Sequence, residues 1–387
     1  MILFDARKIT SFEDFESFLK KETDIFNSTK ISLFEKYDML KADLTESSIE
    51  EYQSFRNEYR ELVQRIIKDV IAHYRHHLPK KCLITEFGSF IKRTERILSD
   101  IDITFCYDEE KTAIYECAEE LIDFTIASVL GFSIDHVHGN FQHYPKNEEF
   151  NKLTERDNHY RIQFDENVID YKCGPETLAE NLTNIKNIRD YKTLLTSFEI
   201  KYQKKADIDS LYSIEIIENT TNHDFLSDLM KFEDKYDICE NYQFKLQDSS
   251  LNENFSISEL KKILKHNGIV EFYIFIAKVC KCVKIFNSYY MNIEILWNNK
   301  TFIEFFGSDF VNRMRTSFIS FIFYWNRIEL SLNKRGIALS TRCYKCVSKK
   351  EIDVMLNDDW GNSTSIDTIL ISKNTLTHII SEGLAKI

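Results

Sequence analysis

The first part of the chain is patterned as two long amphipathic helices. Between residues 10 and 45, apolar side chains recur at helical spacing behind Thr10 and Ser11, which are suitable N-cap residues. A second stripe runs from about Ser47 to His77, and its apolar residues lie three and four apart: Ile49, Tyr52, Phe55, Tyr59, Leu62, Ile66, Val70 and Tyr74. Pro79 cannot continue a helix, so the pattern predicts that the second helix ends before it.

Between residues 82 and 205 the pattern changes to short apolar runs that alternate with helical stripes. Strands are predicted at Cys82–Thr85, Ile103–Phe105, Ile134–Val137, Tyr160–Phe164 and Val168–Tyr171. Helical spacing covers Glu110–Val129, which Gly131 closes, and it returns from Pro175 to about Gln203. This succession predicts a small mixed β-sheet with flanking helices.

From residue 206 onward the pattern is almost wholly helical. Buried helices are predicted at Ile269–Ile285 and Phe310–Leu332, and a final helix near Lys373–Ala385. Polar stretches at Asn241–Ser256 and Asn357–Ser363 are predicted loops. We therefore expect an α+β protein in three parts: an N-terminal helical segment (1–46), a domain built on the mixed sheet (47–205) and a mostly α-helical C-terminal domain (206–387).

The composition adds a helical bias and an acidic balance to this picture. Of the 387 residues only nine are Gly and three are Pro, which argues against long loops. The net charge of −12 argues against indiscriminate binding to phosphate backbones, so a nucleic-acid partner would need a local basic patch. The chain begins without a signal-peptide pattern, and lysines follow the apolar run Ile269–Ile276 too soon for a membrane span. We expect a soluble, cytoplasmic protein with no membrane partner.

Nine cysteines are scattered along the chain. Cys280, Cys282, Cys343 and Cys346 have the residue type for a four-thiolate zinc site. Cys280 and Cys282 fall within a predicted helix, however, and side chains two apart on a helix diverge. Free thiols in a reducing compartment are the favoured interpretation.

The most informative stretch is residues 83–105, where a predicted strand enters the turn Gly88–Ser89. A basic segment then leads to Ser99-Asp100-Ile101-Asp102 and a second strand. Residues two apart on a strand share a face, so Asp100 and Asp102 are expected on one side while Ile101 and Ile103 enter a core. Two adjacent carboxylates repel each other, and a cation between them relieves that repulsion. The pattern predicts a site for Mg²⁺, with Mn²⁺ as an alternative.

The residues around this pair suit the binding of a nucleoside triphosphate. Gly88 lets the backbone approach a phosphate, and the hydroxyls of Ser89 and Ser99 are further candidates for nucleotide contacts. Positive charge for the phosphates is available from three nearby side chains, Lys92, Arg93 and Arg96. A third carboxylate from a neighbouring strand would complete a two-metal site. Taken alone, each part also fits a solvated turn or a solvated helix face.

The combined spacing resembles the signature of the polymerase-β-type nucleotidyltransferase superfamily, nearest to PII uridylyltransferases and to nucleotidyltransferases fused to CBS domains. Those proteins carry G-S-x-G-R-x-E ahead of S-D-x-D, whereas this chain has Gly88-Ser89-Phe-Ile-Lys-Arg93-Thr-Glu95. The Arg and Glu therefore stand one place later, and the second Gly is missing. The resemblance extends weakly over residues 47–203.

A later stretch, Val168-Ile-Asp170-Tyr-Lys172-Cys-Gly174, is similar to the D-[FY]-R-x-x-G segment of the CBS-linked group. The resemblance implies that Asp170 is the third metal-binding carboxylate, with a Lys in place of the family's Arg. Asp165, which also follows an apolar strand, is the alternative.

The activity implied by the resemblance is transfer of a nucleoside monophosphate from ATP or UTP to an acceptor hydroxyl, with release of pyrophosphate. A protein is the expected acceptor; an RNA 3′ end or a small molecule is the alternative, and the acidic balance disfavours RNA. A hypothesis of another class is a catalytically inactive, nucleotide-binding regulatory module. Retention of both Asp100 and Asp102 disfavours it, because unneeded paired charges are costly.

Overall fold

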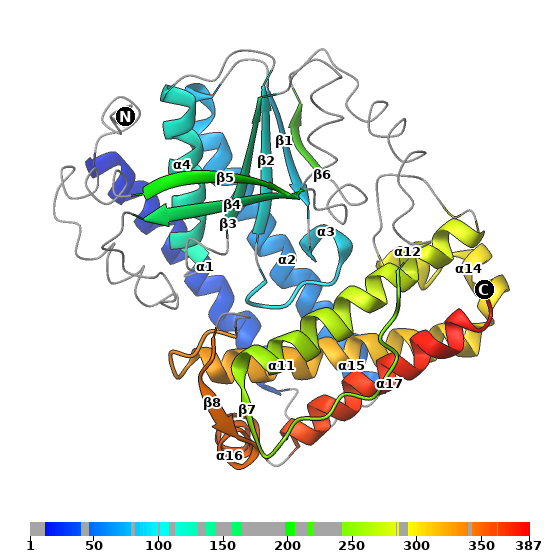
Figure 1. Cartoon of the computed structure of the whole chain (residues 1–387). Coiled ribbons are helices and arrows are strands. Elements are labelled where there is room, and N and C mark those ends of the chain that lie inside the picture. The colour runs from blue at the N-terminus through cyan, green and yellow to red at the C-terminus, as the bar shows by residue number, and fades with distance from the viewer. Residues whose placement is uncertain are drawn as a thin grey trace. The chain divides into compact units, whose positions relative to one another are not determined.

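The computed structural model of the chain combines long helices with β-sheets, which places the protein in the helix-rich α+β class (Figure 1). It describes residues 12–39, 46–78, 82–87, 89–99, 101–107, 113–130, 137–143, 157–164, 198–205, 215–219, 242–283, 285, 293–339, 343–361 and 363–387. None of the helices in these ranges is long and apolar enough to cross a membrane.

Contacts divide the chain into two units, and each unit is assembled from three separate segments. The first, here called the sheet unit, consists of Met1–Ser32, Tyr59–Ile91 and Ser99–Glu233. The second, here called the helical unit, consists of Leu33–Glu58, Lys92–Leu98 and Asp234–Ile387. The helices α1 (Phe12–Met39) and α2 (Glu46–Tyr74) therefore contribute to both units.

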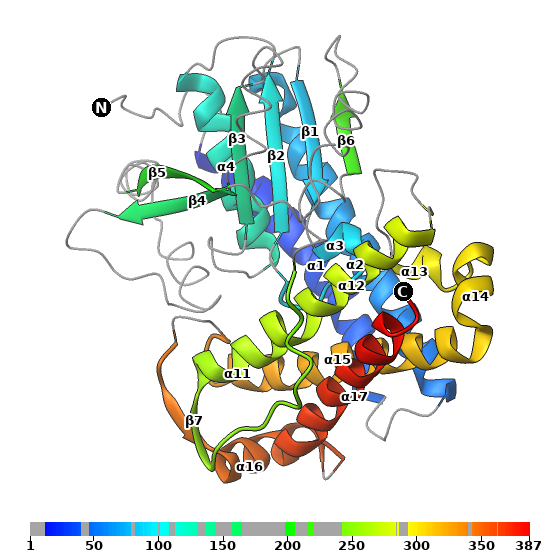
Figure 2. The ribbon, with the colours of Figure 1, turned by 45° about the vertical axis from the view of Figure 1, so that its right-hand side comes forward.

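The sheet unit is built on four strands in the order β3-β2-β1-β6 (Figure 2). These strands are β1 (Cys82–Phe87), β2 (Ile101–Tyr107), β3 (Val137–His143) and β6 (Glu215–Asn219). The central strand β1 is antiparallel to both β2 and β6, whereas β2 and β3 are parallel. The sheet is thus mixed, as predicted. The parallel crossover between β2 and β3 contains α4 (Ala113–Leu130), which contacts β3.

The core of the sheet unit follows the alternation of the strand sequences. Ile84, Ile101 and Ile103 are fully buried, which confirms the predicted inward positions of the two isoleucines on β2. Helix α4 buries the apolar face that its helical spacing predicts, including Leu121, Ile122 and Ile126. The helix predicted at 110–129 is confirmed, within the usual variation of helix ends.

A separate two-stranded sheet pairs β4 (Asp157–Phe164) with β5 (Phe198–Lys205). β4 confirms the strand predicted at Tyr160–Phe164, but β5 shows that helix was the wrong prediction for residues 198–203. Phe198, Ile200 and Tyr202 alternate with polar residues, and they pair across the sheet with Phe164, Ile162 and Tyr160. In the sequence, this alternation of apolar and polar residues directly follows a stretch with helical spacing. The whole stretch was therefore assigned to a helix.

Three other predictions need correction. β6 is a strand within the region predicted to be almost wholly helical, and β3 begins at Val137, where the predicted strand was to end. Residues 357–360, predicted to form a loop, are the last turn of α16 (Lys349–Trp360). Here Ile352, Met355, Leu356 and Trp360 form a buried face that reaches the end of the helix, and packing outweighs the turn propensity of Asn and Asp.

The helical unit is organised around α15 (Ser308–Asn333), which buries most of its length. α15 contacts α14 (Lys300–Phe306), α16 and α17 (Ile366–Leu384), and α17 also contacts α12 (Glu271–Val283). α12 is preceded by α11 (Ile257–Leu264) and a π-helical turn, η4 (Lys265–Val270). Short helices α3 (Ser89–Lys92), η2 (Arg75–His77) and α13 (Ile293–Leu296) and the paired strands β7 (Asn254–Ser256) and β8 (Cys346–Ser348) complete the described elements.

Gly383 permits close packing of α17 in the helical unit. A Cβ atom at this position would lie 2.7 Å from Cε2 of Phe275 and 3.3 Å from Cζ of Phe310. We expect Gly383→Ala to lower the free energy of unfolding by about 1–3 kcal/mol, because both rings must move to admit the methyl group. Urea unfolding measures the change. Ser381→Ala, an exposed change on the same helix, should stay within about 0.5 kcal/mol, and an equal effect of the two would contradict this account.

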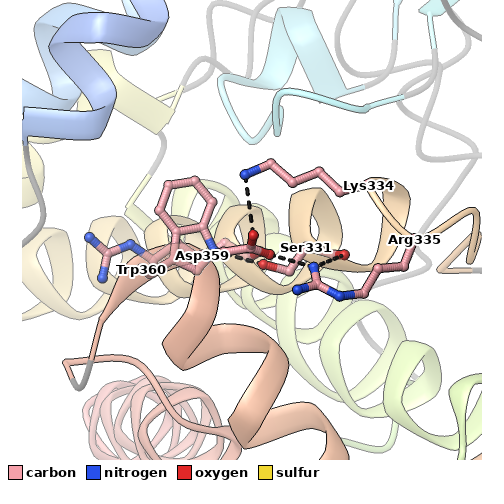
Figure 3. Close-up of polar contacts among 6 residues, drawn as sticks. Ser331, Lys334, Arg335, Asp359 and Trp360 are labelled. Carbon is pink, nitrogen blue, oxygen red and sulfur yellow. Dashed lines mark hydrogen bonds and ion pairs between the residues drawn. The ribbon is translucent and has the colours of Figure 1, made fainter.

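The end of α16 is joined to α15 by a polar cluster, drawn in Figure 3. Trp360 Nε1 donates to Ser331 Oγ at 2.8 Å, and the Asp359 carboxylate accepts from Arg335 at 2.6 Å and from Lys334 at 3.4 Å. Desolvation raises the pKa of Asp359, but hydrogen bonds from Ser331 and Arg335 and the nearby positive charges outweigh it and lower the pKa overall.

A lowered pKa in the folded state stabilises the protein above the unfolded pKa of Asp, about 3.9, and this contribution is lost as the pH falls through the folded value. We expect Asp359→Asn to cost about 1 kcal/mol at pH 7, since its partners are partly exposed, and less at an acidic pH below the unfolded pKa of Asp, where the carboxylate becomes protonated. Urea unfolding at both pH values measures this. Asp358→Asn, an exposed neighbour, should show no such pH-dependent difference; the same difference there would contradict the assignment.

Candidate active site

The candidate active site lies at one end of the mixed sheet, where β1 ends and β2 begins. Phe87, the last residue of β1, pairs with Asp102, the second residue of β2. Ser89 begins α3 two residues after Phe87 and is partly exposed. The antiparallel pairing therefore brings Ser89, at the start of α3, and Asp102, near the start of β2, to the same end of the sheet.

Two neighbouring strands bring further polar residues to this end of the sheet. His138 on β3 occupies the register position beside Asp102, and Glu215 on β6 pairs with Glu86 on β1. Sequence reasoning did not select Glu215, because the region after residue 205 was interpreted as helical. The β-branched pair Ile216–Ile217 was the available signal for a strand there. The described part of β3 carries no carboxylate.

The segment after α3 has an unusual backbone and little exposure. Arg93 has φ of 62°, in the left-handed region that non-glycine residues rarely adopt. Its carbonyl oxygen accepts a hydrogen bond from Arg56 Nη2 at 2.8 Å. Thr94, Glu95 and Arg96 are all buried. The hydrogen bond from Arg56 and the burial of residues 94–96 therefore restrict the backbone of this segment to one conformation.

Arg96, predicted to contact phosphate, is engaged within the helical unit. Its Nε donates to Glu329 Oε2 at 2.8 Å, and its guanidinium lies 4.1 Å from the centroid of the Trp325 ring. Only 8% of the residue is exposed. These contacts give Arg96 a structural role, and contact with a nucleotide stays a prediction. Lys92, the other predicted basic residue, ends α3.

The remaining predicted site residues are described only in part. Ser99 is buried, with 1% of its surface exposed. Several predicted residues lie outside the described ranges: Gly88, Asp100, Asp165 and Asp170. The described residues contain no group of three or more side chains that could hold a metal, but three of the four candidate aspartates are not among them. The magnesium site and the choice between Asp170 and Asp165 stay predictions.

No protein-family model matches the chain, and no curated protein matches its sequence.

Proposed function

We propose that the protein is a magnesium-dependent nucleotidyltransferase, which moves a nucleoside monophosphate from a triphosphate to an acceptor hydroxyl. The observation that supports the proposal is the pairing of Phe87 with Asp102, because Phe87 stands two residues before Ser89, the first residue of α3, at the same end of the sheet. A phosphate-binding turn and metal-binding carboxylates must be adjacent for this chemistry. We propose a nucleotidyltransferase fold for the part of the chain that contains the mixed sheet and its antiparallel β1–β2 pair.

The candidate donors fit Mg²⁺ on chemical grounds. Asp100 and Asp102 supply carboxylate oxygens, the ligands that this hard cation takes in proteins, and Mn²⁺ accepts the same donors. Bound there, the ion would neutralise charge on the phosphates. Asp170, or Asp165 in its place, would supply the further carboxylate.

In the proposed reaction the acceptor oxygen attacks the α-phosphorus in line, and a new phosphorus–oxygen bond forms. The bond between the α-phosphorus and the bridging oxygen breaks, and pyrophosphate leaves with that oxygen. The acceptor proton passes to the third carboxylate, for which Asp170 is the first candidate. Ser89 at the start of α3 would donate its hydroxyl to the β- and γ-phosphates. We propose a protein as the acceptor.

The proposal is tested with nucleotides labelled at a defined phosphate. The purified full-length chain is incubated with Mg²⁺, a lysate and each NTP, carrying the label on the α-phosphate or on the γ-phosphate. Label transferred from the α position alone identifies nucleotidyl transfer, whereas label from the γ position would identify a kinase and contradict the proposal. Protein and RNA are then separated, because label in RNA or in a small molecule would move the acceptor there.

An inactive binding module predicts a different result. No label with any NTP, together with unchanged nucleotide affinity in Asp100→Ala, would exclude the enzyme. Loss of label from the same variant, with its thermal stability retained, supports catalysis at this position.

A further inference from the structure

A segment of the helical unit, residues 242–251, runs beside α17 before the chain enters β7; we call it the strap (Figure 1 and Figure 2). The strap belongs to neither a helix nor a strand. Its first side chains alternate in exposure: three apolar ones, Tyr242, Phe244 and Leu246, are half-buried, and the polar ones between and after them are exposed. A period of two is typical of an extended chain that has one side against a surface.

Two charged side chains from neighbouring helices hold the first part of the strap through its backbone. Glu271, the first residue of α12, accepts a hydrogen bond from the N–H of Lys245 at 2.5 Å. Lys373 on α17 donates from Nζ to the carbonyl oxygen of Gln247 at 3.5 Å. Both Glu271 and Lys373 are fully buried. The main chain of the strap thus contacts a buried acid and a buried base.

Asn374, the next residue of α17, holds the following part of the strap. Its Oδ1 accepts from the backbone N–H of Ser249 at 2.8 Å, and its Nδ2 donates to the carbonyl oxygen of Ser249 at 3.1 Å. The backbone contacts therefore fall on every second residue. Alternate residues of an extended chain present their N–H and C=O groups to the same edge, where a β-sheet would add a strand. Here three side chains take the place of that strand, and we call them the binding face: Glu271, Lys373 and Asn374.

The strap satisfies the binding face only in part. Glu271 Oε2 is buried and has no hydrogen-bond partner among the described residues. The Lys373 contact of 3.5 Å is longer than the usual range of about 2.7–3.2 Å. Burial raises the pKa of Glu271 and lowers the pKa of Lys373, as expected where desolvation outweighs the compensating contacts. Desolvation of these charges therefore offsets part of the stabilisation that strap docking provides.

We propose that the binding face is a site for an extended segment of a partner protein, apolar at alternate positions, and that the strap fills this site when the partner is absent. The contacts to the main chain supply affinity for an extended segment, and the alternate apolar side chains supply specificity. The strap of a second copy would make the same incomplete contacts. A partner segment that also offers a donor to Glu271 Oε2 would make more of them. The inference goes beyond the proposed nucleotidyl transfer and does not depend on it.

The test uses the full-length chain and a fluorescent peptide with the sequence of residues 242–251, followed by anisotropy. In the wild-type chain the tethered strap competes at an effective concentration on the order of millimolar. A release variant, Phe244→Ser with Leu246→Ser, removes two half-buried side chains of the strap but leaves the binding face intact. We expect the peptide to bind the release variant with an apparent Kd about 100-fold lower than for the wild-type chain.

Substitutions on α17 in the release variant test whether the peptide occupies the binding face. Asn374→Leu should raise the Kd about 30-fold, because two hydrogen bonds to the peptide backbone are lost. Thr375→Val, at the exposed neighbouring position, is the matched control and should change the Kd by less than about twofold. Equal effects of the two substitutions would place the peptide elsewhere and overturn the inference.

Two altered peptides test which features of the ligand are recognised. Ser249→Pro removes the N–H that Asn374 accepts, so binding should weaken about tenfold or more. A peptide with Gln243→Ser and Gln247→Ser, both at exposed positions, should bind within about twofold of the original. Loss of binding in this second peptide would restrict the site to the strap itself and contradict a role for a partner.

Absence of binding to a release variant that circular dichroism shows to be folded overturns the inference and makes the strap a fixed part of the fold. A wild-type dimer in sedimentation that the peptide dissociates assigns the binding face to a second copy, and it overturns the inference as well.

Hydrogen exchange of the wild-type chain decides the matter if the release variant does not fold. With saturating peptide, the amides of Lys245 and Ser249 in the chain should exchange at least about tenfold faster, because a displaced strap loses its acceptors. Unchanged exchange at both amides would contradict displacement. These measurements need no NTP, so their failure leaves the proposed function untouched.

Discussion

Replacing Asp102 by Ala is expected to reduce nucleotidyl transfer by at least about 1000-fold while the chain stays folded. A lost metal-binding carboxylate removes several kcal/mol of transition-state stabilisation, and about 4 kcal/mol corresponds to this factor. Asp102 pairs with Phe87, two residues before Ser89, so the substitution acts at the proposed site. The measurement is single-turnover transfer of α-labelled nucleotide, with circular dichroism as the check of folding.

The control is Asp309→Asn, which changes an exposed carboxylate on α15 and should leave the rate unchanged. A sharper variant is Asp102→Cys: it should be inactive with Mg²⁺ and regain activity with a thiophilic ion such as Cd²⁺. Normal activity of Asp102→Ala with Mg²⁺ would show that this aspartate does not serve the reaction.

Replacing Phe323 by Ala is expected to lower the free energy of unfolding of the helical unit by about 3–5 kcal/mol. The Phe323 ring is fully buried, with the Tyr52 ring centroid at 5.0 Å and the Tyr37 centroid at 5.8 Å. The Arg327 guanidinium stacks on it at 4.1 Å. The substitution removes this packing on all sides and leaves a cavity among large rings, which cannot close easily.

Tryptophan fluorescence during urea unfolding isolates this effect, because all three tryptophans, Trp297, Trp325 and Trp360, belong to the helical unit. The control is Phe305→Ala on α14, where 41% of the residue is already exposed. Its expected cost is below about 1 kcal/mol. Similar losses in both variants would mean that the cluster around Phe323 is no better packed than the surface.

The sequence predicted the long helices and the central strands because their periodicity is strong. The stripe from Ile49 to Tyr74 is buried as α2, and Ile101 and Ile103 are buried as predicted. β5 and β6 were missed for a physical reason: their stability comes from pairing with distant strands. Local spacing cannot show that Phe198 will face Phe164, or that Glu215 will face Glu86.

The order of the candidate-site motifs along the chain can be predicted from the sequence. The tertiary contacts of the residues between them cannot. The Gly-Ser and Asp-x-Asp motifs are local patterns, and the sheet register pairs Phe87, which precedes the first motif, with Asp102 of the second. Arg96 shows the limit of such reasoning. A basic residue near a phosphate motif suggests a phosphate contact, yet its guanidinium is held by Glu329, 233 residues later in the chain. Only tertiary packing reveals that partner.

That long separation has a consequence for how the protein folds during synthesis. Arg56 and Glu95 are made early, while Asn326 and Glu329, which hold the same segment, emerge more than two hundred residues later. The helical unit thus cannot complete its core until α15 has been synthesised. Contacts of such high sequence separation slow folding and leave apolar surface uncovered in the meantime. The nascent chain is therefore expected to depend on chaperones until α15 has emerged.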